Sequence, residues 1–181
     1  MSASIFTSHI AQRLKSLRSD RGISLDATAG LTGVSKAMLG QIEREESSPT
    51  IATLWKIASG LEVSFSFFFA SEPRLCSDQE SFPNDPNMKV KTLFPYAPDT
   101  QLEVFEITLT NGHQQLSESH SSGVIEHVHV LEGRLSVLLD GQWQEVNTGQ
   151  SLRFNGAQQH GYHALSKSVT FHNIIRYIEV V

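Results

Sequence analysis

The chain has 181 residues, of which 39% are hydrophobic and 18% charged, and this apolar content excludes disorder over its whole length. Its formal net charge of −5 excludes a protein that coats nucleic acid without sequence preference. The charge is uneven, because residues 1–70 hold seven Lys or Arg and six Asp or Glu, whereas residues 71–181 hold seven and thirteen. Only the N-terminal part can therefore approach DNA phosphates without net repulsion.

A single cysteine, Cys76, rules out an internal disulfide framework and is typical of a reducing compartment. No signal peptide is recognisable, and no apolar run approaches the roughly 18 residues that a membrane-spanning helix requires. We therefore expect a cytoplasmic protein that has no membrane partner.

Apolar periodicity in the first seventy residues predicts five short helices. The first is amphipathic and ends at the turn before Gly22, and Ser24 is placed to cap the second. Pro49 breaks the chain before Thr50 opens the fourth helix, whose inward face is predicted to hold Ile51, Leu54, Ile57, Ala58 and Leu61. The five predicted helices cover residues 4–20, 25–32, 36–44, 51–60 and about 65–69.

The third of these helices has the features of a DNA-reading element. Gly33 can adopt the left-handed conformation that ends the preceding helix, and Ser35 is placed to cap the next one. Its buried face is predicted to consist of Met38, Leu39 and Ile42. The opposite face combines cationic and amide donors with a small residue, as the reading of base edges in a major groove requires: Lys36, Ala37, Gln41 and Arg44.

Residues 8–70 resemble the phage-repressor (Xre-type) family of helix-turn-helix DNA-binding domains. The likeness rests on Ile23-Ser24-Leu25, Gly33-Val34-Ser35, Gln41-Ile42-Glu43 and Pro49-Thr50, while Thr28 departs from the usual leucine of the family. The resemblance implies that the start of the third helix reads base edges through Lys36, Ala37 and Gln41, beside the capping Ser35, and that Arg13, Arg44, Ser48 and Thr50 contact phosphates.

Composition and periodicity change after the helices. Residues 71–88 contain three prolines among polar residues, which predicts a linker between a DNA-binding domain at 1–70 and a second domain at 89–181. The second domain shows about eight short apolar runs separated by turn signals such as Asp140-Gly141, which predicts a small antiparallel β-barrel or jelly roll with room for a ligand. The predicted strands cover residues 89–94, 102–109, 123–131, 134–139, 142–146, 151–154, 161–165 and 169–180.

Seven of the eight histidines lie in this second domain. Strand alternation groups Glu126 with Val128 and Val130 on the inner face. His127 and His129 then point to the outer face, so they are not expected to be ligands.

The run from His120 to Gly133, followed by Gly149 and His160, resembles the two motifs of the cupin superfamily over residues 89–180. The resemblance implies a metal-ligand set of His120, Glu126 and His160, with Ser122 in place of the second histidine of the family. Two imidazoles and a carboxylate suffice for Zn²⁺ or Fe²⁺, and we expect zinc, with other divalent metals left open, because nothing here demands redox chemistry. Two alternatives remain: a degenerate pocket whose polar groups hold an organic ligand, and a purely structural role.

Together the two resemblances imply a transcription regulator that binds a palindromic operator in double-stranded DNA as a homodimer, while its cupin domain binds a small-molecule effector. Residues 34–58 are similar to regulators of sulfur utilisation in enterobacteria, which implies a methionine- or cysteine-related effector. One alternative is a metal-dependent cupin enzyme, a dioxygenase or isomerase, tethered to DNA, and another is the antitoxin of a toxin–antitoxin pair. We expect no enzyme, because the ligand set is incomplete and no general base is found beyond it.

Overall fold

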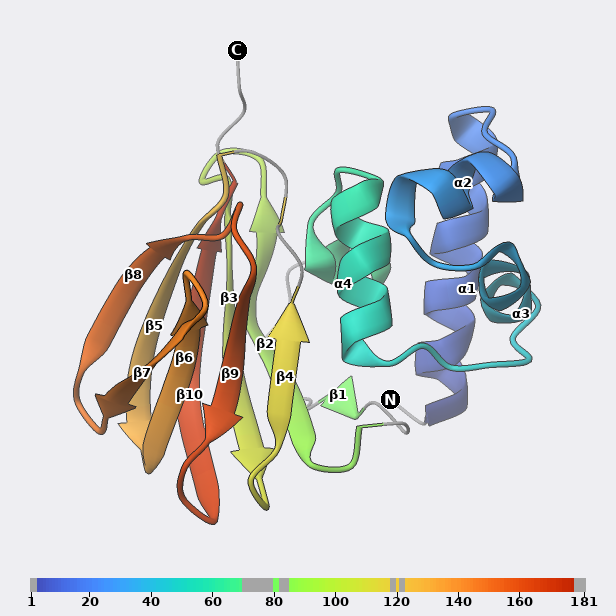
Figure 1. Ribbon diagram of the computed structural model, residues 1–181. Coiled ribbons are helices and arrows are strands. Elements are labelled where there is room, and N and C mark those ends of the chain that lie inside the picture. Colours follow the sequence, from blue (N-terminus) through green and yellow to red (C-terminus); the bar gives the residue numbers. More distant parts are fainter. Residues whose placement is uncertain (1–2, 70–79, 82–84, 118–119, 121–122, 178–181) are drawn as a thin grey trace.

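The computed structural model describes residues 3–69, 80–81, 85–117, 120 and 123–177. Figure 1 shows a helical half packed beside a half built of strands, and we call these the helical domain (residues 3–69) and the strand domain (the described residues from 80 to 177). Cys76, Ser122, most of the predicted linker and the end of the last predicted strand lie outside the described residues.

The described part of the helical domain has four α-helices: α1 (Ala3–Asp20), α2 (Leu25–Thr32), α3 (Lys36–Glu43) and α4 (Ile51–Gly60). Gly33, at φ 66°, adopts the left-handed conformation that closes α2 and allows the tight turn into α3. The three later helices each begin at a hydroxyl residue whose side chain accepts a backbone hydrogen bond, from Ala27 N to Ser24, from Met38 N to Ser35 and from Thr53 N to Thr50.

The prediction of a fifth α-helix is wrong, since Phe65–Phe68 form a single 3-10 turn, η1, and the described residues of this domain contain four α-helices. Four residues are too few to offset the cost of helix nucleation. The first two backbone N–H groups of the turn instead donate to the carboxylate of Glu103 in the strand domain, from Phe65 at 3.1 Å and from Ser66 at 3.0 Å. A tertiary contact therefore determines the conformation of this segment.

The packing faces of the helices are largely as predicted. The five inward residues expected on α4 are all at most 1% exposed. On α3, Leu39 and Ile42 are buried, but the prediction for Met38 is wrong, because this side chain is 39% exposed and Gly40 is buried instead. A bidentate ion pair from Arg18 on α1 to Glu43 fits this orientation, since it holds the Leu39–Glu43 side of α3 against α1.

The strand domain forms two antiparallel sheets in its described residues (Figure 1). The larger sheet has, in spatial order, β1 (Glu80–Ser81), β2 (Met88–Ala97), β3 (Leu102–Thr110), β10 (Ser168–Arg176), β5 (Ile125–Glu132) and β8 (Ser151–Asn155). The smaller sheet has β4 (Gln114–Ser117), β9 (His160–Ala164), β6 (Arg134–Leu139) and β7 (Gln142–Asn147).

The antiparallel sheets agree with the prediction, but the described strands do not close into a barrel. The hydrogen-bonded ladders end at β1 and β8 in one sheet and at β4 and β7 in the other. Inner residues of the two sheets pack against each other, as Tyr162 and Phe171 do with ring centroids 5.2 Å apart. Sequence analysis missed β4, because Gln-Gln-Leu-Ser contains no β-branched residue and becomes a strand only by pairing with β9.

The helical and strand domains are joined by buried hydrogen bonds. Glu103 on β3 is fully buried and accepts from the backbone of η1 and from the hydroxyl of Tyr177. Burial raises the pKa of the Glu103 carboxyl, and these hydrogen bonds only partly offset the rise. At the other end of the contact, Asp85 Oδ2 accepts from Ile51 N, the first residue of α4, at 2.8 Å.

We expect Glu103→Gln to lower the free energy of unfolding by about 1–3 kcal/mol, because its NH₂ group would face a buried backbone donor that then lacks an acceptor. Urea denaturation followed by circular dichroism measures this loss. The control is Glu106→Gln, the same change at a half-buried position of the same strand, for which we expect a change below about 0.5 kcal/mol. An equal loss in the two variants would show that Glu103 has no special part in joining the domains.

Candidate functional site

The structure places the predicted base-reading residues together on the outer side of α3. Ser35, Lys36, Ala37 and Gln41 are all exposed, and the buried Leu39 and Ile42 hold the other side of the helix in the core. The Ser35 cap and the Gly33 turn fix where this exposed face begins. A short helix fixed at its start and exposed along one side is the geometry with which a recognition helix enters a major groove.

The cations on this surface are paired with nearby carboxylates. Lys36 Nζ lies 2.6 Å from Asp26 Oδ2, and Arg44 makes a bidentate pair with Glu46 at 2.8 Å. These four side chains are more than half exposed, so each pair contributes little stability. Both cations can therefore exchange their carboxylate partners for phosphates at small cost.

The remaining predicted phosphate contacts have other roles in the fold as well. Arg13 donates to the backbone carbonyl of Phe67, and its guanidinium lies 5.6 Å from the centre of the Phe67 ring, so it fastens α1 to η1. Thr50 caps α4, and Ser48 lies half-buried in the turn before it. Sequence reasoning missed the ion pair by which Arg18 holds α1 against α3, because its partner Glu43 is distant in the sequence.

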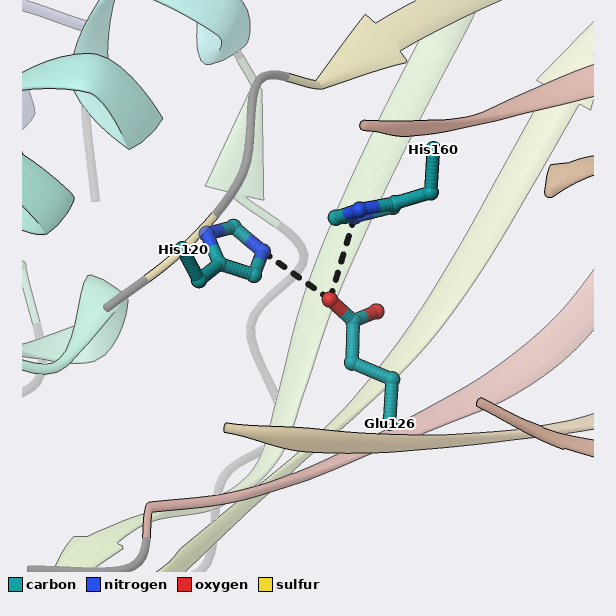
Figure 2. A group of neighbouring side chains, drawn as sticks. All are labelled: His120, Glu126 and His160. Carbon is teal, nitrogen blue, oxygen red and sulfur yellow. Dashed lines mark ion pairs between the residues drawn. The ribbon is translucent and has the colours of Figure 1, made fainter. Parts of the chain in front are cut away.

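A second cluster lies inside the strand domain, where His120, Glu126 and His160 meet (Figure 2). Glu126 Oε1 lies 2.9 Å from His120 Nε2 and 3.1 Å from His160 Nε2. Glu126 comes from β5, His160 begins β9, and His120 lies in the segment before β5. The two strands belong to different sheets, so the cluster sits between them.

The Glu126 carboxylate is fixed from behind by two residues that sequence reasoning missed. Its Oε2 accepts from the hydroxyl of Tyr162 at 2.5 Å and from Asn173 Nδ2 at 3.0 Å. A signal for both is present in the sequence. Tyr162 is two residues from His160 on β9, and Asn173 alternates with the apolar inward residues Phe171 and Ile175 on β10.

Hydrogen bonding sets the tautomer of His160. Its Nδ1 lies 2.9 Å from the backbone carbonyl of Gln158, which can only accept, so Nδ1 carries the proton and the Nε2 lone pair of the neutral ring faces Glu126. Among the described residues, no donor meets hydrogen-bond geometry at Glu126 Oε1. Two nitrogens and an unsatisfied buried oxygen, all within 4.8 Å of one another, are a donor set that fits a divalent cation.

Glu126 and His160 shift each other's pKa in opposite directions. Burial by itself would raise the pKa of the Glu126 carboxyl, but the imidazoles of His160 and His120 outweigh it and hold this pKa well below its usual range. Burial opposes charge on His160 as well, yet the carboxylate of Glu126 raises the pKa of that imidazole. The carboxyl of Glu126 therefore stays ionised, which is the form that binds a divalent cation.

One member of the cluster also contacts the helical domain. His120 Nδ1 lies 3.0 Å from Ser59 Oγ on α4, and its ring packs against the indole of Trp55 with centroids 4.7 Å apart. Because the other ring nitrogen faces Glu126, the single side chain of His120 links the two domains. No pattern in the sequence pairs His120 with α4.

Both domains match known families. Residues 14–68 match the helix-turn-helix family, and residues 105–175 match the cupin domain family. The chain is 47% identical to the HTH-type transcriptional regulator SutR of Escherichia coli (strain K12) over 169 residues, which are 93% of this chain and 94% of SutR. The chain belongs to the HTH-type transcriptional regulators that carry a cupin domain.

Solved structures agree with this assignment. The crystal structure of an HTH_3 family transcriptional regulator from Vibrio cholerae is 62% identical to this regulator, with a TM-score of 0.92 over 97% of this chain and 99% of that one. The cupin domain of an XRE family transcriptional regulator from Enterobacter cloacae is 38% identical over 51% of this chain and 99% of that chain, with a TM-score of 0.50.

The regulator is therefore a DNA-binding transcriptional regulator, as the relatives SutR and the Vibrio cholerae protein are, which cover 93% and 97% of this chain. The same relatives argue against a small antitoxin, since SutR and the HTH-type transcriptional regulator PuuR of Escherichia coli (strain K12) align along both domains. In the described residues, no helix has the length and apolarity that crossing a membrane requires.

Proposed function

We propose that this regulator binds a palindromic operator as a homodimer and that a small metabolite, bound through the cupin domain, changes its affinity for that operator. The observation that carries the proposal is the position of His120, which touches Ser59 and Trp55 of α4 and Glu126 of the cupin site at once. A change at the buried cluster thus reaches the DNA-binding domain through one side chain. Two-fold symmetry would place the recognition helices about 34 Å apart, one turn of DNA.

We further propose that His120, Glu126 and His160 hold Zn²⁺, with other divalent metals as alternatives. The tautomer of His160 and the unsatisfied Glu126 Oε1 support this. Bound zinc would supply a fixed positive charge beside Glu126 and require the Nε2 lone pair of His120. The Nδ1 atom of His120 would then carry the proton and donate to Ser59 Oγ, so metal binding would set the direction of the hydrogen bond between the domains.

The similarity of residues 34–58 to regulators of sulfur utilisation supports a methionine- or cysteine-related compound as the metabolite. Such an effector must favour one placement of the recognition helices, since a ligand that binds two states equally does not shift the equilibrium between them.

Native mass spectrometry of the purified protein measures its subunit count and its metal content together. A dimer with one metal ion per chain supports the proposal, and a metal-free monomer would contradict it.

We expect Ser59→Ala to keep the zinc content of the wild type but to lose the effect of zinc on operator affinity. The variant removes only the hydroxyl at the domain contact and leaves the three ligands in place. Fluorescence anisotropy with a labelled operator, obtained by in vitro selection, measures the affinity with zinc and after chelation. The control is Ser64→Ala, because Ser64 precedes η1 and its side chain makes no capping hydrogen bond.

A wild-type response to zinc in the Ser59→Ala protein would show that the coupling does not run through this hydrogen bond. A loss of response in Ser64→Ala as well would mean that the change reflects a general disturbance of α4 and η1.

A further inference from the structure

A pocket of about 250 Å³ is lined by residues of both domains. Several of them belong to α4 and β4, which are neighbours in Figure 1. We call it the interdomain pocket. It is smaller than the roughly 300–1,000 Å³ of pockets for drug-sized ligands, so it suits a small metabolite. The helical domain contributes Leu31, Thr32, Ala52, Trp55, Lys56, Ser59 and Gly60, and the strand domain contributes Leu116, Ser117 and His120.

The lining of the interdomain pocket is amphipathic. Leu31 and Leu116 are large apolar side chains that are 57% and 48% exposed, one from each domain. Trp55 is held in place because its indole stacks on Phe65 with ring centroids 4.1 Å apart. An apolar part of a ligand placed here would cover surface that water otherwise contacts.

The polar part of the lining carries a positive charge. Lys56 is the one side chain with a formal charge among the described lining residues, apart from the imidazole of His120. Ser59 and Ser117 add hydroxyl groups. A ligand carboxylate can accept from this ammonium group and the flanking hydroxyls, whereas no described lining side chain carries the negative charge that a cationic ligand requires.

We propose that the interdomain pocket is the effector site and that it takes a small carboxylate with an unbranched apolar arm, about the size of an amino acid. The inference rests on the proposed function, and it places the metabolite of that proposal where the cupin domain meets the helical domain, with lining residues from both. Such a ligand contacts α4 and β4 at the same time, so its affinity depends on how the two domains are placed. His120 forms one wall, so the same ligand also touches one member of the cluster of His120, Glu126 and His160.

Trp55 provides a reporter for the test. The chain has two tryptophans, and Trp143 lies on β7, which does not line the pocket. In a Trp143→Phe protein the tryptophan fluorescence, excited selectively over that of the three tyrosines, therefore comes from Trp55 alone. We expect hexanoate to change this emission in a saturable way, while hexylammonium at the same concentrations does not. The absence of a saturable change with hexanoate would overturn the proposal.

Three variants in the same background define the site. We expect Lys56→Met, which keeps the aliphatic stem, to weaken hexanoate binding at least about tenfold, whereas Lys56→Arg retains it. We expect Ala52→Leu, which fills part of the pocket, to abolish binding. Thermal melts confirm that each variant is folded, and unchanged hexanoate binding in both Lys56→Met and Ala52→Leu would place the ligand elsewhere.

Operator binding separates the two proposals. If the protein binds its operator and zinc but hexanoate leaves Trp55 unaffected, the pocket assignment fails and the proposed function stands. If hexanoate binds at Trp55 but operator affinity is the same at every hexanoate concentration, the pocket is a real site for carboxylates and its role as the effector site fails.

Discussion

Replacing Gln41 by alanine is expected to weaken binding to the cognate operator about five- to 150-fold, a loss of about 1–3 kcal/mol. Gln41 lies on the exposed face of α3, the helix whose start is fixed by the Ser35 cap. Its amide can donate and accept at once, which suits a bidentate contact with the edge of an adenine. Fluorescence anisotropy with the selected operator and with a scrambled duplex, at one salt concentration, measures the change.

Only the affinity for the operator should fall, because phosphate contacts carry the binding to the scrambled duplex. The matched control is Gln12→Ala, which removes the same amide from an exposed position on α1. Arg44→Ala, in contrast, should weaken binding to both duplexes to a similar extent. If Gln41→Ala discriminates between the duplexes as well as the wild type does, Gln41 does not read a base.

Sequence analysis predicted the helices well where the determinants are local. The caps at Ser24, Ser35 and Thr50 and the inward face of α4 depend on residues within a few positions of each other, and all are present in the structure. The errors arise where a residue distant in the sequence determines the local conformation. Glu103 holds the backbone of η1, so a segment of four aromatic and polar residues turns instead of extending as a helix.

The strands show the same division. Turn signals separated the eight predicted strands. The polar β4, however, forms only by pairing with β9. The division into two sheets depends on which strands pair with each other, and several of these pairs are distant in the sequence. Motif resemblance brought together His120, Glu126 and His160 as a candidate site, and the structure places them in contact. The link from His120 to Ser59 spans 61 positions of the sequence, and only the packing of α4 on the strand domain creates it.

Replacing His160 by alanine is expected to lower zinc affinity by more than about 100-fold, because it removes one of the three proposed ligands. Tyr162→Phe should lower the affinity by about 10–100-fold, since it deletes only the hydroxyl that fixes Glu126 Oε2. Competition with a chromophoric chelator measures both values. The matched control is His163→Ala on the same strand, whose ring contacts Trp143 rather than the cluster, and it should bind zinc as the wild type does.

The order of these three variants distinguishes a metal site from a structural one. Asn173 also donates to Glu126 Oε2, so the carboxylate keeps one support in Tyr162→Phe and the loss stays smaller than in His160→Ala. If the role of the cluster is purely structural, neither the wild type nor any variant binds zinc. His160→Ala then only has a lower melting temperature than the wild type. If zinc binds equally to wild type and His160→Ala, the ion lies outside this cluster and the coupling through His120 has no metal to act on.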